Sequence, residues 1–225
     1  MGLVEPASSI TDFALGIVAI GVALGLWRKD RISPHWSRAF ASIGVAALLG
    51  GIHHGFLKSH ETIATVSWST ISMVIAIGIT FLLAATVATV LGDGRGRPLM
   101  AVRSISLVAF LVLAILGRAT VSTLVITEGL VMIMVVVLWM HAWRLGQPGV
   151  GLILVAIGAS ILAAGVRGSS LHFTFVGWEF DPTALYHLAQ MPGLVLLYVA
   201  IQRRAKAVDL GPTTEQPSLS LAGGT

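Results

Sequence analysis

The sequence has no cysteine, and only 11% of its 225 residues are charged. Without cysteine there is no disulfide, no thiolate metal site and no covalently attached c-type haem, so histidine, carboxylate, amide or water ligands would have to hold any metal. Soluble domains carry about a quarter charged residues. Because 56% of this chain is hydrophobic, a single core with a polar shell cannot accommodate it, and the excess apolar area is expected to face lipid.

Charge of either sign is scarce, but the balance is basic, with a net charge of +4 and a pI of about 10.1. The lysines and arginines lie between apolar segments, where they orient helices, so no nucleic-acid partner is expected. No basic residue precedes the first apolar run, whereas Arg28, Lys29 and Arg31 follow it. This order indicates a membrane anchor rather than a cleaved signal peptide.

Seven apolar stretches approach the length that a membrane span needs, which is about 20 residues. Turn-forming residues such as Gly94, Pro98, Pro148 and Gly149 separate several of them. We therefore predict an all-α fold, a polytopic membrane protein whose seven-helix bundle occupies residues 1–204, followed by a disordered tail at 205–225. The predicted spans are Asp12–Trp27, Trp36–Leu57, Thr62–Leu91, Leu99–Gly117, Ala119–Trp143, Gly149–Val166 and Thr183–Gln202.

The basic residues divide unequally between the two sides of this predicted membrane. Of the connectors between the predicted spans, those on the side of the N-terminus hold Lys58, Arg118 and Arg167. The opposite side, where the seventh span ends, holds ten basic residues: Arg28, Lys29, Arg31, Arg38, Arg95, Arg97, Arg144, Arg203, Arg204 and Lys206. The positive-inside rule then predicts a cytoplasmic C-terminus and an N-terminus outside. Trp178 falls near the outer boundary, where an aromatic belt is expected.

Histidines and carboxylates gather at the outer end of the predicted bundle. His53 lies about 5 Å inside the end of the second span, and His187 about 6 Å inside the start of the seventh. Asp12 opens the first span on the same side. His53 and His54 are about 100° apart around the helix axis, so only one can point squarely into a shared site. Gln190, three residues after His187, shares its helix face and would support it.

Neutral imidazoles with a carboxylate and an open position would suit Zn²⁺, which lowers the pKa of a bound water and makes it a nucleophile. The candidate metal ligands are His53, His54, His172 and His187. The candidate catalytic carboxylates are Asp12 and Asp181, either of which could ligate, orient a histidine or act as a general base.

Plainer roles stay open for each of these residues. Asp12 could cap the first helix, and Asp181 before Pro182 has the pattern of an N-cap followed by an N1 proline. His172 could be a solvated loop residue. The imidazoles at 53, 54 and 187 could bond to one another or to backbone carbonyls across helices, and Gly50 with Gly51 could serve close helix packing.

Glu128 lies apart from this group, about nine residues into the fifth span, and is the most deeply buried carboxylate in the predicted topology. A structural role, with a hydrogen bond to a neighbour such as Thr127, is favoured. A proton relay is the alternative.

Three motifs carry a resemblance: TDFAL at 11–15, GGIHHGF at 50–56 and LYHLAQ at 185–190. Together they resemble an uncharacterised family of bacterial seven-helix membrane proteins with a TDYAL start, a GGxxHGF block and an NDLYHxxQ block. The resemblance extends over the whole length and implies a multi-pass protein of the bacterial plasma (inner) membrane. Thr183 and Ala184 replace the Asn-Asp of the third block.

By arrangement, that family is similar to the wider group of membrane hydrolases that includes alkaline ceramidases and progestin/adiponectin receptors. The similarity implies a zinc held by one histidine near the second helix and two on the last, which carries over to His54 (or His53) and His187. Two positions depart from the group's pattern. Leu49 and Gly50 stand where a serine is expected, and Met191 replaces the second histidine of HxxxH, so His172 or Asp181 would have to supply the missing ligand.

Three hypotheses for the function follow. The first is a metal-dependent hydrolase that acts on a lipid amide or ester at the outer leaflet, with the lipid bilayer as partner and lipid as substrate. The second is a non-enzymatic lipid- or ligand-binding sensor, or a subunit of a membrane complex. The third is a b-type haem protein ligated by His53 or His54 with His187. A retinal protein is not expected, because no lysine lies inside the seventh span.

Overall fold

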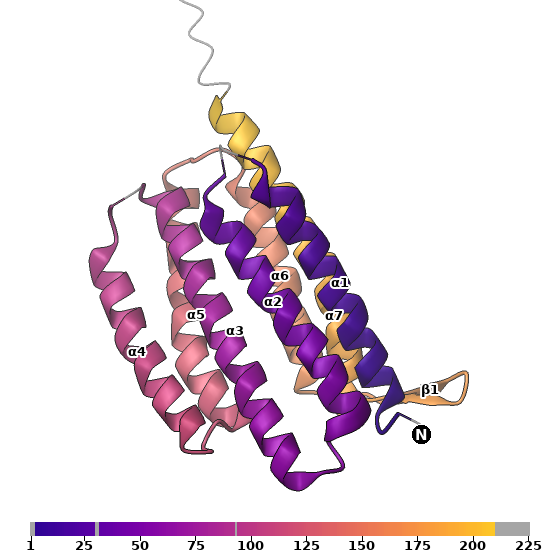
Figure 1. Cartoon of the computed structure of the whole chain (residues 1–225). Coiled ribbons are helices and arrows are strands. Elements are labelled where there is room, and N and C mark those ends of the chain that lie inside the picture. Colours follow the sequence, from indigo (N-terminus) through magenta and orange to yellow (C-terminus); the bar gives the residue numbers. More distant parts are fainter. Residues whose placement is uncertain (1–2, 30–31, 93, 210–225) are drawn as a thin grey trace, which may run out of the picture.

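The computed structural model describes residues 3–29, 32–92 and 94–209. Its helices are α1 (Pro6–Trp27), α2 (Pro34–Ile52), the π-helical turn η1 (His53–Leu57), α3 (Glu61–Val90), α4 (Arg97–Ile115), α5 (Val121–Arg144), α6 (Val150–Arg167) and α7 (Pro182–Asp209). Two short strands, β1 (Phe173–Phe175) and β2 (Trp178–Phe180), lie between α6 and α7 (Figure 1). All seven α-helices, with η1 continuing α2, are long and apolar enough to cross a membrane.

The seven predicted spans are confirmed as helices, with two notable differences at their ends. The first helix begins at Pro6 rather than Asp12, because the polar residues Ser8, Ser9 and Thr11 are helical although they interrupt the apolar run. The alternative role of Asp12 as a helix cap is therefore wrong. At the other end, α7 continues to Asp209, so residues 205–209 of the predicted tail are helical. The rest of that tail, 210–225, lies outside the described residues.

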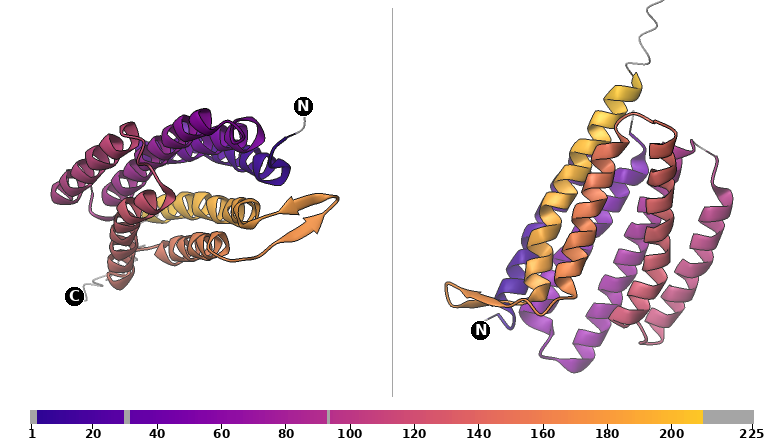
Figure 2. Two further views of the ribbon diagram at one scale, coloured as in Figure 1. Left: turned by 90° about the horizontal axis from the view of Figure 1, so that it is seen from below. Right: turned by 180° about the vertical axis from the view of Figure 1, so that it is seen from behind.

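The helices form two rows that face each other. Helices α1 to α4 follow one another in one row, while α7 packs across from α1 and α5 across from α3 (Figure 2). The main apolar core lies between the rows, where Phe40, Leu83, Val131 and Ile153 are among its most buried members. The N-terminal end of α1 and the end of α7 lie at opposite ends of the bundle (Figure 1).

The outer surface of the bundle is apolar as well. Ile17 on α1, Ile105 and Ile115 on α4, and Leu162 on α6 are all exposed. Helix α4 is the least buried of the seven. Soluble proteins rarely expose so many large apolar side chains together, so this surface fits a hydrocarbon solvent better than water.

The connection between α6 and α7 departs from the all-α prediction, because it contains a β-hairpin. The strands β1 and β2 pair antiparallel, with Phe173 opposite Phe180 and Phe175 opposite Trp178. Val176 and Gly177 form the turn, and both have positive φ, at 51° and 77°. The sequence offered Phe-Thr-Phe and Trp-Glu-Phe around Val-Gly, which is a short alternating pattern of the hairpin kind.

Glu128 forms an ion pair with Arg103 of α4 in the interior. Arg103 Nη2 lies 2.9 Å from Glu128 Oε2, and both side chains are almost completely buried. Arg103 also donates to the Thr80 hydroxyl at 2.8 Å and to the Ala76 carbonyl, both on α3. The two charges thus join α3, α4 and α5, which supports the structural role for Glu128 over a proton relay.

Candidate acid–base site

Three polar side chains meet at the end of the bundle where α1 begins. Asp12 comes from the second turn of α1, His54 from η1 and His187 from the second turn of α7. The residues are 42 and 133 positions apart along the chain (54 − 12 and 187 − 54), and only the packing of α1 against both α2 and α7 unites them. The predicted convergence of His54 and His187 with Asp12 is thus seen in the structure.

The Asp12 carboxylate lies between the two imidazoles. Its Oδ1 is 3.2 Å from His187 Nε2, and its Oδ2 is 3.9 Å from His54 Nε2. The side chains of Asp12 and His187 are only 6% and 8% exposed. Because little water reaches them, each of these three groups depends on the others to stabilise any charge it carries.

The second nitrogen of each imidazole is also held. His54 Nδ1 lies 2.6 Å from Glu5 Oε2, and His187 Nδ1 lies 3.3 Å from Thr11 Oγ1. Contacts of this kind fix the orientation of a ring and select the nitrogen that carries its proton. Both rings are therefore held with Nε2 toward Asp12.

The Thr11 hydroxyl indicates which nitrogen of a neutral His187 carries the proton. The Thr11 hydroxyl donates its single proton to the Ala7 carbonyl at 2.8 Å, so its oxygen accepts from His187 Nδ1–H. A neutral His187 then has only a lone pair at Nε2. His187 Nε2 and the Asp12 carboxylate, 3.2 Å apart, can therefore accept one further proton between them.

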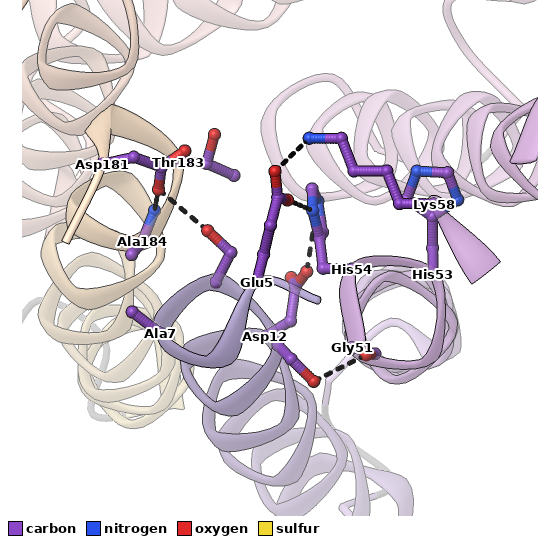
Figure 3. A network of polar contacts seen from close by, with 12 residues as sticks. Glu5, Ala7, Asp12, Gly51, His53, His54, Lys58, Asp181, Thr183 and Ala184 are labelled. Carbon is purple, nitrogen blue, oxygen red and sulfur yellow. Dashed lines mark hydrogen bonds and ion pairs between the residues drawn. The ribbon is translucent and has the colours of Figure 1, made fainter. Parts of the chain in front are cut away.

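The cluster is connected to the surface through Glu5 and Lys58. Lys58 Nζ forms an ion pair with Glu5 Oε1, and Glu5 Oε2 contacts His54 (Figure 3). Side-chain exposure falls along this series, from 45% at Lys58 to 31% at Glu5, 12% at His54 and 6% at Asp12. The contacts make a graded polar path from the surface to Asp12.

Glu5 is held in its ionised form within this path. Its partial burial alone would raise the pKa, but the hydrogen bonds from Lys58 and His54 outweigh that effect and leave the pKa of Glu5 below its ordinary value of 4.5. A carboxylate held in this charged state favours a proton on the facing His54 Nδ1.

The glycines of the second motif make room for α1. A Cβ at Gly50 would lie 2.6 Å from Asp12 Oδ2, and one at Gly51 would lie 2.9 Å from the Phe13 ring. At Gly55 a Cβ would lie 2.7 Å from Ser9 Oγ. The predicted close-packing role of Gly50 and Gly51 is therefore confirmed, and Gly50 has the added effect of admitting the carboxylate.

The two adjacent histidines of η1 face different neighbours. Their rings are 5.2 Å apart and almost perpendicular, at 89°. His53 turns to α3, where its Nδ1 lies 2.6 Å from Ser67 Oγ. Only His54 faces Asp12, so the structure does not bring His53 into this cluster. Single π-helical turns of this kind are frequent at functional sites.

Asp181 serves as the cap of α7. Its Oδ1 accepts from the Ala184 backbone N–H at 2.9 Å and from the Ser8 hydroxyl at 2.8 Å (Figure 3). Burial raises the pKa of Asp181 in isolation, but these hydrogen bonds dominate and leave the pKa below its ordinary value of 3.8. The N-cap role predicted from Asp181-Pro182 is confirmed, and the contact with Ser8 ties α7 to α1 beside the cluster.

The remaining predicted residues lie apart. His172 is half-exposed in the connection to the hairpin, with its Nδ1 3.3 Å from Glu179 Oε1. Gln190 does not support His187, because its Nε2 donates to Ser160 Oγ of α6 at 3.3 Å. Within the described residues, no group of three or more histidine, aspartate or glutamate side chains could hold a metal ion.

Sequence reasoning missed Glu5, Thr11 and Lys58 as members of the site. Thr11 stood next to Asp12 in the first motif, and its hydroxyl was the available signal. Glu5 and Lys58 lie outside the apolar stretches, and only their opposite charges at one end of the bundle marked them. Their contacts with His54 depend on how α1 packs against α2 and η1.

A pocket of about 340 Å³ lies at the other end of the bundle. His35, Arg95, Arg97 and Met100 are among the residues that line it. None of the residues around Asp12 contributes to it, so the polar cluster and this pocket are separate features.

Comparison with known proteins identifies one family model along most of the chain. The model is described as a family of unknown function (DUF6962), and it matches residues 7–206. No curated protein and no solved structure matches the chain. The family match covers all three motifs and agrees with the predicted membership of an uncharacterised family.

Proposed function

We propose that this chain, which belongs to that family of unknown function, is a membrane-embedded hydrolase that cleaves a lipid ester or amide by acid–base catalysis. The observation that supports this most directly is the contact of one buried carboxylate with two imidazoles that other residues hold in place. A general acid and a general base with fixed rings and unequal surroundings are what such a reaction needs.

Asp12 with His187 acts as the base in this proposal. The pair accepts a proton from a water molecule as the water oxygen attacks the carbonyl carbon of the lipid. The bond from that carbon to the ester oxygen or amide nitrogen then breaks, and His54 donates the proton that the leaving group needs. The products are a fatty acid and an alcohol or amine. Proton transfer from Asp12 back to His54 restores the starting state.

The polar path through Glu5 gives His54 a second source of protons. Glu5 contacts His54 Nδ1 and also pairs with Lys58 at the surface. His54 is the more exposed of the two imidazoles and is the one in contact with this path. These two features support the assignment of the acid role to His54 and of the base role to the more deeply buried pair.

The proposed steps need no zinc, because Asp12, His54 and His187 supply the acid and the base themselves. A bis-histidine haem also gains no support, since His54 and His187 both direct Nε2 at the same carboxylate. Elemental analysis of the purified protein tests the zinc prediction separately. Zinc at one atom per chain that is lost in His187→Gln would replace the metal-free mechanism.

The test is lipid turnover by the purified chain in phospholipid nanodiscs. Fluorogenic lipid esters and amides are offered to the native protein and to Asp12→Asn, His54→Gln and His187→Gln. General acid–base catalysis contributes about 10²–10⁴-fold, so each variant is expected to lose at least about 100-fold in rate. His60→Gln, on the exposed connector before α3, is the control and retains the native rate.

Absence of turnover on every ester and amide, or full turnover in the three variants, would overturn the proposal. Thermal unfolding of each variant separates loss of chemistry from loss of fold.

A second candidate function is a proton-dependent sensor. The observation in its favour is that the polar groups on Asp12, His54 and His187 already have partners within the protein. Adding or removing a proton would change how α1 contacts η1 and α7. A spin-label distance between α1 and α7 that changes with pH in the native chain, but not in Asp12→Asn, together with absent lipid turnover, would favour this function.

A further inference from the structure

The β-hairpin between α6 and α7 projects sideways from the bundle. In Figure 1 and in both views of Figure 2 it extends beyond the helices, across the bundle rather than along it. Its base joins Arg167, the last residue of α6, to Pro182, the first residue of α7. Since both helices are membrane-span candidates, the hairpin leaves the bundle at the edge of the apolar layer.

The two faces of the hairpin differ in chemistry. Residues opposite each other across antiparallel strands share a face, and the register places Phe173 opposite Phe180 and Phe175 opposite Trp178. All four residues of that face are aromatic. The Phe173 and Phe180 rings stack at 5.0 Å. The other face carries Thr174 opposite Glu179, so the hairpin is amphipathic although it is only two strands wide.

The aromatic face has little protein against it. Phe173, Phe175 and Trp178 are all exposed, and only β2 contacts the neighbouring helices α1 and α7. A two-stranded hairpin is marginally stable in water by itself. Trp and other aromatic rings are enriched at the boundary between lipid headgroups and acyl chains. This boundary lies at the edge of the apolar layer, so it can contact the exposed aromatic face of the hairpin.

The turn residue points to the same surroundings. Val176 is 81% exposed and has a φ of 51°. A β-branched residue pays a steric penalty in this left-handed region, where glycine or asparagine is favoured. An exposed valine side chain gains no hydrophobic free energy in water. Its transfer into the acyl region of a bilayer is favourable and offsets this steric cost.

We propose that the β1–β2 hairpin is a lipid-contacting element that lies along the outer membrane surface with its aromatic face and Val176 in the acyl–headgroup boundary. The partner of this surface is the lipid bilayer. The strands are three residues long at roughly 3.3 Å each, so the tip of the hairpin lies about 10 Å from its base. The proposed lipid contact is independent of the proposed hydrolase activity. The two regions are adjacent, because β2 is followed directly by Asp181 and the first residue of α7.

Because the chain has no cysteine, a single substitution gives a unique labelling site. A nitroxide is attached to Phe175→Cys, to Val176→Cys and to the control Thr174→Cys, each in the full chain in phospholipid nanodiscs. Collision rates with oxygen, which concentrates in lipid, and with a water-soluble nickel chelate are compared. We expect oxygen to exceed nickel several-fold at 175 and 176, and the reverse at 174.

Equal nickel access at all three positions would place the hairpin in water and overturn the proposal. Protection from both reagents at 175 and 176 would indicate a protein partner and would also overturn it. Val176→Asn in the Phe175→Cys background separates the turn from the apolar contact, since asparagine accepts the positive φ. The oxygen-to-nickel ratio at 175 is expected to fall in that variant, and an unchanged ratio would contradict a lipid role for Val176.

Discussion

The Asp12 carboxylate is the residue on which the polar cluster depends, and the absence of a side chain at Gly50 is what admits it. Each oxygen of Asp12 faces a different imidazole, so a small displacement of this carboxylate would disturb both contacts. The polar cluster therefore depends on Gly50 of α2 as much as on its titratable side chains.

Gly50→Ala is expected to destabilise the bundle by about 2 kcal/mol, the usual cost of forcing an extra methyl group into a packed interior. The new Cβ would lie 2.6 Å from Asp12 Oδ2 and 3.0 Å from its Cγ. Thermal unfolding in detergent measures the effect. Gly21→Ala on α1 is the matched control, because a Cβ there meets nothing within 4 Å, and equal loss in the two variants would contradict the steric argument.

Asp181 gives a prediction for pH. Its folded-state pKa lies below the ordinary value of 3.8, so its carboxylate stabilises the fold above that value, and the contribution is lost as the pH falls through the lowered folded value. Asp181→Asn is expected to unfold at a lower temperature than the native chain at pH 7. The difference should shrink as the pH falls below about 3.8, and a difference that grows on acidification would refute the capping argument.

At the scale of elements, α4 is held in the bundle differently from the helices around the polar cluster. Helices α1, α2, α3 and α7 share extensive buried contacts, whereas α4 packs mainly on α3 and contributes only Arg103, Phe110 and Ala114 to the buried residues. The ion pair between Arg103 and Glu128 is therefore one of the few buried contacts that hold α4.

Removing one partner of this ion pair leaves an unpaired charge in the interior. Arg103→Met and Glu128→Gln are each expected to destabilise the bundle, by roughly 3–5 kcal/mol where a charge is left uncompensated. The double variant should recover much of that loss, because both charges are gone. A double-mutant cycle from thermal unfolding measures the coupling, and strictly additive losses would show that the pair does not act as a unit.

At the scale of the whole molecule, the odd number of helices places the start of α1 and the end of α7 on opposite sides. The hairpin and the α2–α3 connection lie at the same end of the bundle as the start of α1 (Figure 1). The polar cluster lies at this end too, because Asp12 is in the second turn of α1. The distribution of lysine and arginine predicts that this side is outside.

Labelling of single cysteines in intact cells tests that orientation. Ser59→Cys, in the exposed α2–α3 connection, is expected to react with a membrane-impermeant maleimide from outside. Leu145→Cys, exposed between α5 and α6, should react only after the membrane is permeabilised. The opposite pattern would reverse the topology and would place the proposed site on the cytoplasmic face.

The sequence by itself determined the seven helices, because runs of apolar residues bounded by proline and glycine have few other stable arrangements in lipid. It also indicated that His53 or His54 lies at the depth of His187, with Asp12 on the same side, because helical rise converts position along a span into distance. The helix-capping role of Asp181 followed from its place before Pro182.

Only the tertiary structure decided which side chains meet. Packing sets the rotation of α1, η1 and α7 about their axes, and in this packing His53 faces α3 while His54 faces Asp12. The partnership of Arg103 with Glu128 crosses from α4 to α5 and leaves no trace in either segment alone. The depth of a residue along a helix follows from counting residues. The direction in which its side chain points depends on packing against helices that are distant in the sequence.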